Sequence, residues 1–291
     1  MKHRLQQFDD YWVVEDEEGY GNALVLLKPW SARYLKVLKR HQIKIIRLND
    51  RLGWSGTDIS FVLTIPGIHG VDLISEEVTD VSPVFEIGGL KTLSLYCKAK
   101  VAGDFLKLKK LQSVGLQWAP VYHSLFGLRS LRRINVLGFP QIDLTCWEQN
   151  TRATSLSLSS HSLQSLGGIE RFARLKTLDL YRCRNLKSLE ALADSPSLHR
   201  LHLAQCPGID DLTPVARLRQ LRVLELVDCH AIRSVAPLAK CKELRRVQIA
   251  RNTTVADGDL SPLRRLTNLK EVLLAHRKHY SHTAEELERK Q

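Results

Sequence analysis

The stretch Leu175-Lys-Thr-Leu178-Asp-Leu180-Tyr-Arg-Cys183 decides the fold, because the chain repeats its pattern three more times. The repeats are Leu198-His-Arg-Leu201-His-Leu203-Ala-Gln-Cys206, Leu221-Arg-Val-Leu224-Glu-Leu226-Val-Asp-Cys229 and Leu244-Arg-Arg-Val247-Gln-Ile249-Ala-Arg-Asn252. All four follow one template, L-x-x-L-x-L-x-x-C/N. Side chains alternate along a strand, so the apolar residues of each copy predict one short β-strand with a buried face.

The same template extends outward over most of the chain. Eleven candidate units begin at residues 43, 68, 90, 111, 131, 153, 175, 198, 221, 244 and 269. They are spaced 20 to 25 residues apart, and the segment 141–152 fits the template worst. A single unit cannot bury its own leucines, so neighbouring units are expected to stack over one continuous core. This core accounts for the 49 leucines among the 291 residues.

The segment that follows each strand narrows the class of repeat. Asp211-Leu-Thr-Pro214, Ser234-Val-Ala-Pro237 and Asp259-Leu-Ser-Pro262 recur at one phase, and Asp58-Ile-Ser-Phe61 and Asp80-Val-Ser-Pro83 match them. Asp or Ser suits the cap of a helical turn, and Pro suits a first-turn position that needs no donor.

The pattern as a whole resembles the short-repeat class of leucine-rich repeats found in internalins and in the leucine-rich regulatory subunit of protein phosphatase 1. The resemblance covers about residues 43–276. It implies an α/β leucine-rich-repeat solenoid with a curved parallel sheet on the concave side and 3₁₀ or short helical turns on the convex side.

The two ends of the chain lie outside the repeats. In residues 1–42, the segments 11–16 and 23–27 predict a hairpin, and the segment 31–41 predicts a helix. We expect this region to form an N-terminal cap that shields the first unit, and residues 277–291 to form a C-terminal cap or a polar tail.

Cys183, Cys206, Cys229 and Asn252 share one template position, the column at the exit of each strand. This column is expected to turn inward and bond backbone groups. The six cysteines include no Cys-x-x-Cys pair, so we expect reduced thiols rather than disulfides or a zinc framework.

Other features of the sequence point away from a membrane or a cofactor. The first ten residues are too polar for a secretory signal, and no apolar run is long enough to cross a bilayer, so a cytoplasmic location is expected. His276, His279 and His282 are spaced three apart and would share one face of a helix, but no carboxylate or Cys completes a metal site. The common hydrolase, protease and nucleotide-binding motifs are absent, so no cofactor and no enzymatic activity are expected.

A binding role is expected on the concave sheet, where side chains that flank the inward leucines are exposed. The candidate protein-binding residues are Tyr96, Trp118, Arg133, Asp179, Tyr181, Arg182, Arg200, His202, Glu225, Asp228, Arg246 and Arg251. Tyr, Trp and Arg are enriched at interface hot spots. Two alternatives remain open: the aromatic residues either contact a partner or pack on their own sheet, and the opposite charges either contact a ligand or pair with each other.

The net charge of +12 is concentrated after residue 150, where 24 Lys and Arg face 15 Asp and Glu. The surplus falls just before each strand and at the second template position. We call these residues the basic flank: Arg219, Arg222, Lys242, Arg245 and Arg265. Such a flank is either a solvated edge that keeps the protein soluble or a rim that steers acidic partners.

These observations predict a non-enzymatic cytoplasmic scaffold that binds another protein with an acidic or mixed-charge surface. It would act as an inhibitor or adaptor, and analogy of fold suggests an immunity protein against a toxin. The alternative is a nucleic-acid-binding protein that uses the basic flank. The balanced charges expected on the concave floor argue against that alternative.

Overall fold

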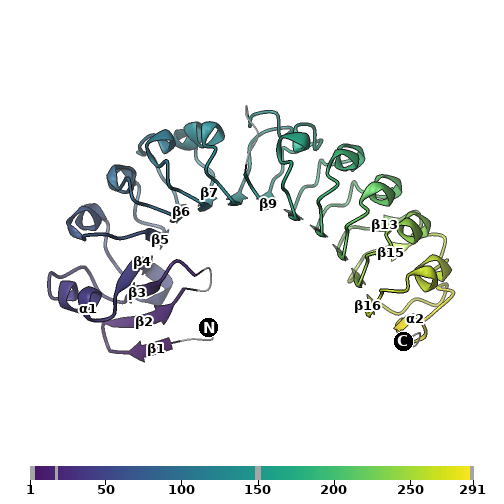
Figure 1. The fold of residues 1–291 in the computed structure, drawn as a ribbon, viewed down its shortest axis with the longest axis horizontal. Coiled ribbons are helices and arrows are strands. Elements are labelled where there is room, and N and C mark those ends of the chain that lie inside the picture. Colours follow the sequence, from purple (N-terminus) through teal and green to yellow (C-terminus); the bar gives the residue numbers. More distant parts are fainter. Residues whose placement is uncertain (1–3, 17–18, 148–151, 289–291) are drawn as a thin grey trace. The chain divides into compact units, whose positions relative to one another are not determined.

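The computed structural model describes residues 4–16, 19–147 and 152–288, and the chain divides into two compact units, Met1–Asn135 and Val136–Gln291. Each unit is a stack of coils, and most of the coils contain one strand and a short helical turn (Figure 1). The two units are described separately.

The sheet of the first unit begins with antiparallel strands and continues with parallel ones. β1 (Arg4–Gln7), β2 (Tyr11–Glu15) and β3 (Asn22–Leu26) are antiparallel neighbours. The strands that follow pair in parallel and in chain order: β4 (Ile43–Asn49), β5 (Gly70–Ser75), β6 (Thr92–Cys97) and β7 (Ser113–Gln117). Helix α1 (Tyr34–Arg40) connects β3 to β4. Whether residues 1–42 act as a cap stays a prediction.

The second unit continues the same pattern after β8 (Arg133–Leu137), which crosses the boundary between the units. Its parallel strands are β9 (Ser155–Ser159), β10 (Thr177–Tyr181), β11 (Arg200–Ala204), β12 (Val223–Val227), β14 (Arg246–Ala250) and β16 (Glu271–Leu274). A separate short sheet pairs β13 (Ala231–Ile232) with β15 (Thr254–Val255), and helix α2 (Ala284–Glu288) lies near the C-terminus.

Short 3₁₀ helices lie on the side of the coils away from the strands (Figure 1). Those of the first unit are Ser60–Thr64, Ser82–Glu86, Phe105–Lys107 and Pro120–Gly127, whereas the 3₁₀ turn Asp50–Leu52 directly follows β4. Those of the second unit are Ile169–Arg171, Glu190–Asp194, Thr213–Arg217, Ala236–Lys240 and Ser261–Arg265. The predicted architecture of strands and 3₁₀ turns is therefore confirmed.

The predicted caps form as hydrogen bonds at the start of these turns. Asp211 Oδ1 accepts from the Thr213 N–H at 2.8 Å, and Asp58 makes the same bond to Ser60 at 2.7 Å. The hydrogen bonds from Ser60 and Thr213 lower the pKa of Asp58 and Asp211 below the ordinary carboxyl value. Each cap satisfies a backbone donor that the turn itself leaves without a partner.

The column at the strand exits is buried, but its last member differs from the prediction. The thiols of Cys206 and Cys229 lie 3.6 Å and 3.3 Å from carbonyl oxygens of the preceding coil. In the next coil Thr253 is fully buried and its Oγ1 accepts from the Cys229 N–H at 2.9 Å, whereas Asn252 is exposed. Thr253, one residue later than predicted, therefore takes the inward position.

Candidate binding surface

The open face of the sheet in the second unit carries residues from alternate strand positions. Along β10 the burial alternates, so the leucines point inward while Thr177, Asp179 and Tyr181 face outward. The parallel register places the last residues of neighbouring strands side by side. This row consists of Tyr181, Ala204, Val227 and Ala250.

Charged side chains beside this row form what we call the charge ladder: Asp179, Arg200, Glu225, Arg246 and Glu271. Glu225 lies 2.5 Å from Arg200 and 3.5 Å from Arg246, and it is only 7% exposed. At the two ends of the ladder, Arg200 lies 3.8 Å from Asp179 and Arg246 lies 3.2 Å from Glu271. His202 Nδ1 lies 3.7 Å from Asp179. These candidate residues pair with each other across neighbouring strands.

Tyr181 is the exposed aromatic residue of this face. Its side chain is 39% exposed, and the guanidinium of Arg182 lies 4.9 Å from the centre of its ring. Arg182, Asp228 and Arg251 differ from the expected strand positions, because each follows the last residue of its strand. Their φ angles of 54°, 56° and 60° place them in the left-handed region, so they form the rim of the sheet rather than its face.

The candidate residues of the first unit contact other residues of that unit. Tyr96 accepts a hydrogen bond from Asn135 Nδ2 at 3.0 Å, and its hydroxyl lies directly over Gly115, where a Cβ would approach it to 2.7 Å. Arg133 donates to the Tyr20 hydroxyl at 3.0 Å and lies over the same ring at 5.4 Å. Tyr20 belongs to the hairpin between β2 and β3.

Trp118 lies one residue beyond β7 rather than within it. Its ring stacks on Phe126 of the following 3₁₀ helix, with ring centroids 5.1 Å apart and an interplanar angle of 18°. In the first unit the aromatic candidates therefore take part in packing within the unit.

All five residues of the basic flank are exposed. Arg222 and Arg245 occupy the second template position, where the backbone itself forms a ladder: the Arg245 N–H donates to the Arg222 carbonyl at 2.8 Å, and the Lys270 N–H donates to the Arg245 carbonyl at 2.8 Å. We call this row the basic column: Lys176, His199, Arg222, Arg245 and Lys270.

The same position of the first unit holds Lys44, His69 and Lys91, joined by the same backbone bonds. Burial and the charges of Lys91 and Lys44 lower the pKa of His69, as expected where positive groups gather.

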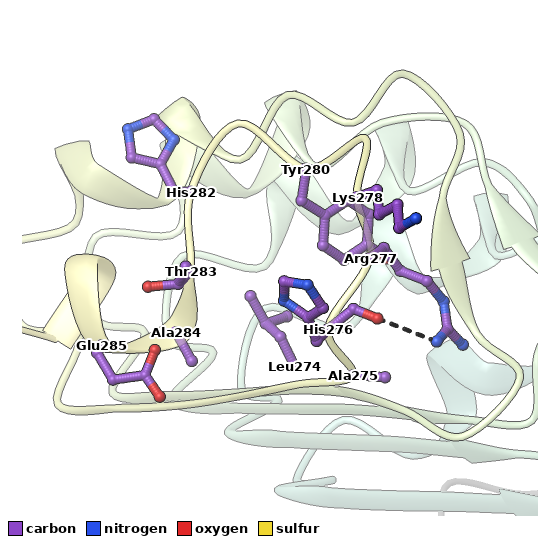
Figure 2. A pocket seen from close by; sticks show the side chains of 10 residues that line it. All are labelled: Leu274, Ala275, His276, Arg277, Lys278, Tyr280, His282, Thr283, Ala284 and Glu285. Carbon is purple, nitrogen blue, oxygen red and sulfur yellow. Dashed lines mark hydrogen bonds between the residues drawn. The ribbon is translucent and has the colours of Figure 1, made fainter.

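The C-terminal segment folds into a loop that encloses a pocket (Figure 2). The ring of His276 lies within the loop and that of His282 points away from it, as Figure 2 shows. Arg277 bridges the carbonyls of His276 and Arg251 at 3.2 Å and 2.8 Å. Residues 276–282 are not helical, so the three histidines do not share the helix face expected from their spacing.

A second pocket lies beyond the C-terminal ends of β10, β11 and β12. It is lined by Arg182, Arg184, Gln205, Pro207, Asp228 and His230. Arg184, Gln205, Pro207 and His230 were not candidates from the sequence. Gln205 could have been found from its template position, which it shares with Arg182 and Asp228. Arg184, Pro207 and His230 come after the last template position, where the sequence has no repeated pattern to mark them.

Within the described residues, no three His, Cys, Asp or Glu side chains gather closely enough to hold a metal ion. The described helices include none that is long and apolar enough to span a membrane. The six cysteines are free thiols, and burial raises the pKa of Cys146 to about 12 and that of Cys241 to about 11.

No protein-family model matches the chain, and no curated protein matches it. Solved structures do. The chain in the TLR13–ssRNA13 complex is 17% identical with a TM-score of 0.50, over 84% of this chain and 45% of that one. An internalin (inlF) of Listeria monocytogenes is 18% identical with a TM-score of 0.49, over 80% and 62% of the two chains. A leucine-rich-repeat protein of Leptospira interrogans is 14% identical with a TM-score of 0.46, over 86% and 81%.

The chain thus spans less than two thirds of the internalin it matches. At these identities the similarity concerns the fold alone. Together with the repeated strands and 3₁₀ turns, it makes the chain a leucine-rich-repeat protein in fold.

Proposed function

We propose that the protein is a non-enzymatic scaffold that binds another protein on the open sheet face of its second unit. The observation that carries this proposal is the exposed Tyr181 at the end of a row of small apolar residues, Ala204, Val227 and Ala250. Tyrosine and arginine dominate the energy of many interfaces, and Arg182 stacks on this tyrosine.

The charge ladder supports the same face. A partner that covers this surface must exclude water from its charges, and an unpaired charge would make that costly. Arg200 and Arg246 already form ion pairs with Glu225, so a partner can cover these side chains without burying an unpaired charge. The first unit is less suited, because its candidate residues already form hydrogen bonds within the unit: Arg133 with Tyr20, and Tyr96 with Asn135.

The partner is a protein with an acidic or mixed-charge surface, which the basic flank steers toward the face. The protein acts as an inhibitor or adaptor, and analogy of fold suggests an immunity protein against a toxin as one form of such an inhibitor. Six free cysteines support a cytoplasmic location, where thiols stay reduced.

The test is affinity purification of the tagged protein from cells that express it, with identification by mass spectrometry. Tyr181→Ala combined with Val227→Arg removes the aromatic side chain and puts a charge into the row. The recovered partner should fall strongly, whereas Glu190→Ala on the 3₁₀ side should leave it unchanged. Equal recovery of the partner with the double variant and with the Glu190→Ala control would show that the partner binds elsewhere.

The basic column favours a second candidate, binding of nucleic acid. Four exposed Lys and Arg side chains and the half-exposed His199 follow one backbone ladder, and Lys and Arg are the residues that contact phosphates. Titration with a DNA duplex and with RNA at two salt concentrations tests this idea. Arg222→Glu with Arg245→Glu should then weaken binding and flatten its salt dependence. No binding at low salt ends this candidate.

A further inference from the structure

Four residues at the rim of the second unit share an unusual backbone conformation. Arg182, Gln205, Asp228 and Arg251 directly follow β10, β11, β12 and β14, and we call them the ridge. Their φ angles lie between 54° and 60°, in the left-handed region. Glycine and asparagine adopt this region readily, whereas a long side chain adopts it at a cost.

The fold requires this conformation but not these side chains. Through it, the Arg182 N–H donates to the Ala204 carbonyl at 2.8 Å, and the Gln205 N–H donates to the Val227 carbonyl at 2.8 Å. Glycine or asparagine would make the same backbone bonds with less strain. Two arginines and a glutamine stand there instead, and strain of this kind is common at ligand sites.

Three residues of the ridge, Arg182, Gln205 and Asp228, line the pocket beyond β10, β11 and β12. Arg182 Nε donates to Gln205 Oε1 at 3.0 Å, which fixes both side chains. Asp228 is held by Asn252 Nδ2 at 3.0 Å and by Arg251 at 3.8 Å. The left-handed His230, with φ 61°, also lines the pocket.

The pocket retains donors that the protein itself does not use. In the described part of the chain, neither the Arg184 guanidinium nor the His230 ring has a side-chain hydrogen bond or an ion pair. Arg184 is exposed and stands beside Arg182 in the lining. A guanidinium with free N–H groups matches the two oxygens of a carboxylate.

We propose that this pocket binds a carboxylate of the protein partner, either an acidic side chain or a chain terminus. This inference rests on the proposed function, since the pocket borders Tyr181 and the row on the sheet face. A protein segment fits better than a nucleic acid. Asp228 in the wall would repel a continuous phosphate backbone, whereas a single carboxylate can avoid it by lying against Arg184.

The test uses a fluorescein-labelled hexaglutamate peptide with a free C-terminus, and fluorescence anisotropy with the full chain at low and at physiological salt. Arg184→Glu should lower the affinity about tenfold. The matched control is Arg40→Glu on helix α1 of the first unit, which makes the same change of charge at an exposed arginine outside both the basic flank and the basic column. It should change the affinity by less than about twofold, because long-range attraction alone is screened by salt.

A second variant tests the argument from strain. Arg182→Asn should raise the melting temperature by a few degrees, because asparagine tolerates the left-handed region. The same variant should bind the hexaglutamate peptide more weakly. Stabilisation together with lost binding is the signature of a residue kept for its ligand. A lower melting temperature with unchanged peptide binding contradicts this role.

Three results would overturn the proposal. These are no binding of hexaglutamate at low salt, equal losses from Arg184→Glu and Arg40→Glu, or tighter binding of a DNA duplex that Arg184→Glu abolishes. None of them concerns the sheet face. If Tyr181→Ala with Val227→Arg still loses the partner while Arg184→Glu keeps it, the pocket proposal fails and the proposed function stands.

Discussion

The guanidinium of Arg200 on β11 lies 2.5 Å from the carboxylate of Glu225 on β12, and Glu225 is almost completely buried. Arg246 on β14 reaches the other oxygen of the same carboxylate at 3.5 Å. One carboxylate therefore joins three neighbouring strands. The open face of the second unit is held by its own charges and needs no ligand to neutralise them.

Removing the charge of Glu225 should destabilise the fold. Glu225→Gln leaves two guanidinium groups close together with only one neutral acceptor between them. We expect the free energy of unfolding to fall by about 2 kcal/mol in urea denaturation. Glu271→Gln is the control, because its side chain is 46% exposed and, among the described residues, forms an ion pair with Arg246 alone. Its expected cost is below about 0.5 kcal/mol, and equal losses would contradict a central role for Glu225.

The caps of the 3₁₀ turns should contribute stability that depends on pH. Asp211→Ala removes the acceptor of the Thr213 N–H and should cost about 1 kcal/mol at neutral pH. Hydrogen bonds from Thr213 lower the pKa of Asp211 in the folded state, so the folded protein binds this proton more weakly than the unfolded chain. The stabilisation is present above the ordinary carboxyl pKa of about 4 and is lost as the pH falls through the lowered value.

Urea denaturation of the Asp211→Ala variant and of the unmodified protein, at neutral and at acidic pH, tests this dependence. The difference between their free energies of unfolding should shrink in acid. The neighbouring Asp210 serves as the control, since in the described part of the chain its carboxylate makes only an exposed ion pair, with Arg233 at 2.9 Å. Asp210→Asn should have little effect at either pH. A constant difference between Asp211→Ala and the unmodified protein would contradict the role of the ionised cap.

Thr253, not Asn252, should be critical for the buried column. Thr253→Val keeps the volume of the side chain but leaves the buried Cys229 N–H without its acceptor. A loss of about 2 kcal/mol is expected. Thr253→Ser retains the hydroxyl and should lose less, and the exposed Asn252→Ala should lose less than Thr253→Val. A larger loss of stability from Asn252→Ala than from Thr253→Val would mean that Asn252, not Thr253, takes the inward position of the column.

Trp118 and Tyr181 should differ in how much each contributes to the free energy of unfolding. Trp118→Ala removes the ring that stacks on Phe126 and should lower the free energy of unfolding by about 2 kcal/mol. Tyr181→Ala removes an exposed ring and should cost less than about 0.5 kcal/mol. A large loss from Tyr181→Ala would mean that this tyrosine serves the fold.

The spacing of the leucines was sufficient to predict the strands and the 3₁₀ turns, because each coil repeats the same local interactions. The caps at Asp58 and Asp211 were predictable for the same reason. The sequence alone leaves open whether Arg200 pairs with Glu225, since this pairing depends on which rotamers the sheet brings together.

Features that depend on distant or shifted residues were not predictable. The contact of Tyr20 with Arg133 joins residues 113 positions apart, and no periodicity connects a hairpin turn to a strand that far along the chain. The shift from Asn252 to Thr253 and the left-handed Arg182 and Gln205 depend on the geometry of the turn after each strand. The template assigns residues to positions there but says nothing of φ.

Site-specific photocrosslinking tests the central claim most directly, the binding of a partner protein on the sheet face of the second unit. A photoreactive amino acid would replace Tyr181, or Gln248, which is half-exposed on β14 beside Glu225. Glu190 on the 3₁₀ side would be replaced as the control, and all proteins would be tested in cells that express the chain. The account predicts a crosslinked protein of the same identity from positions 181 and 248 and none from position 190. A partner captured from position 190 but not from the sheet face would contradict it.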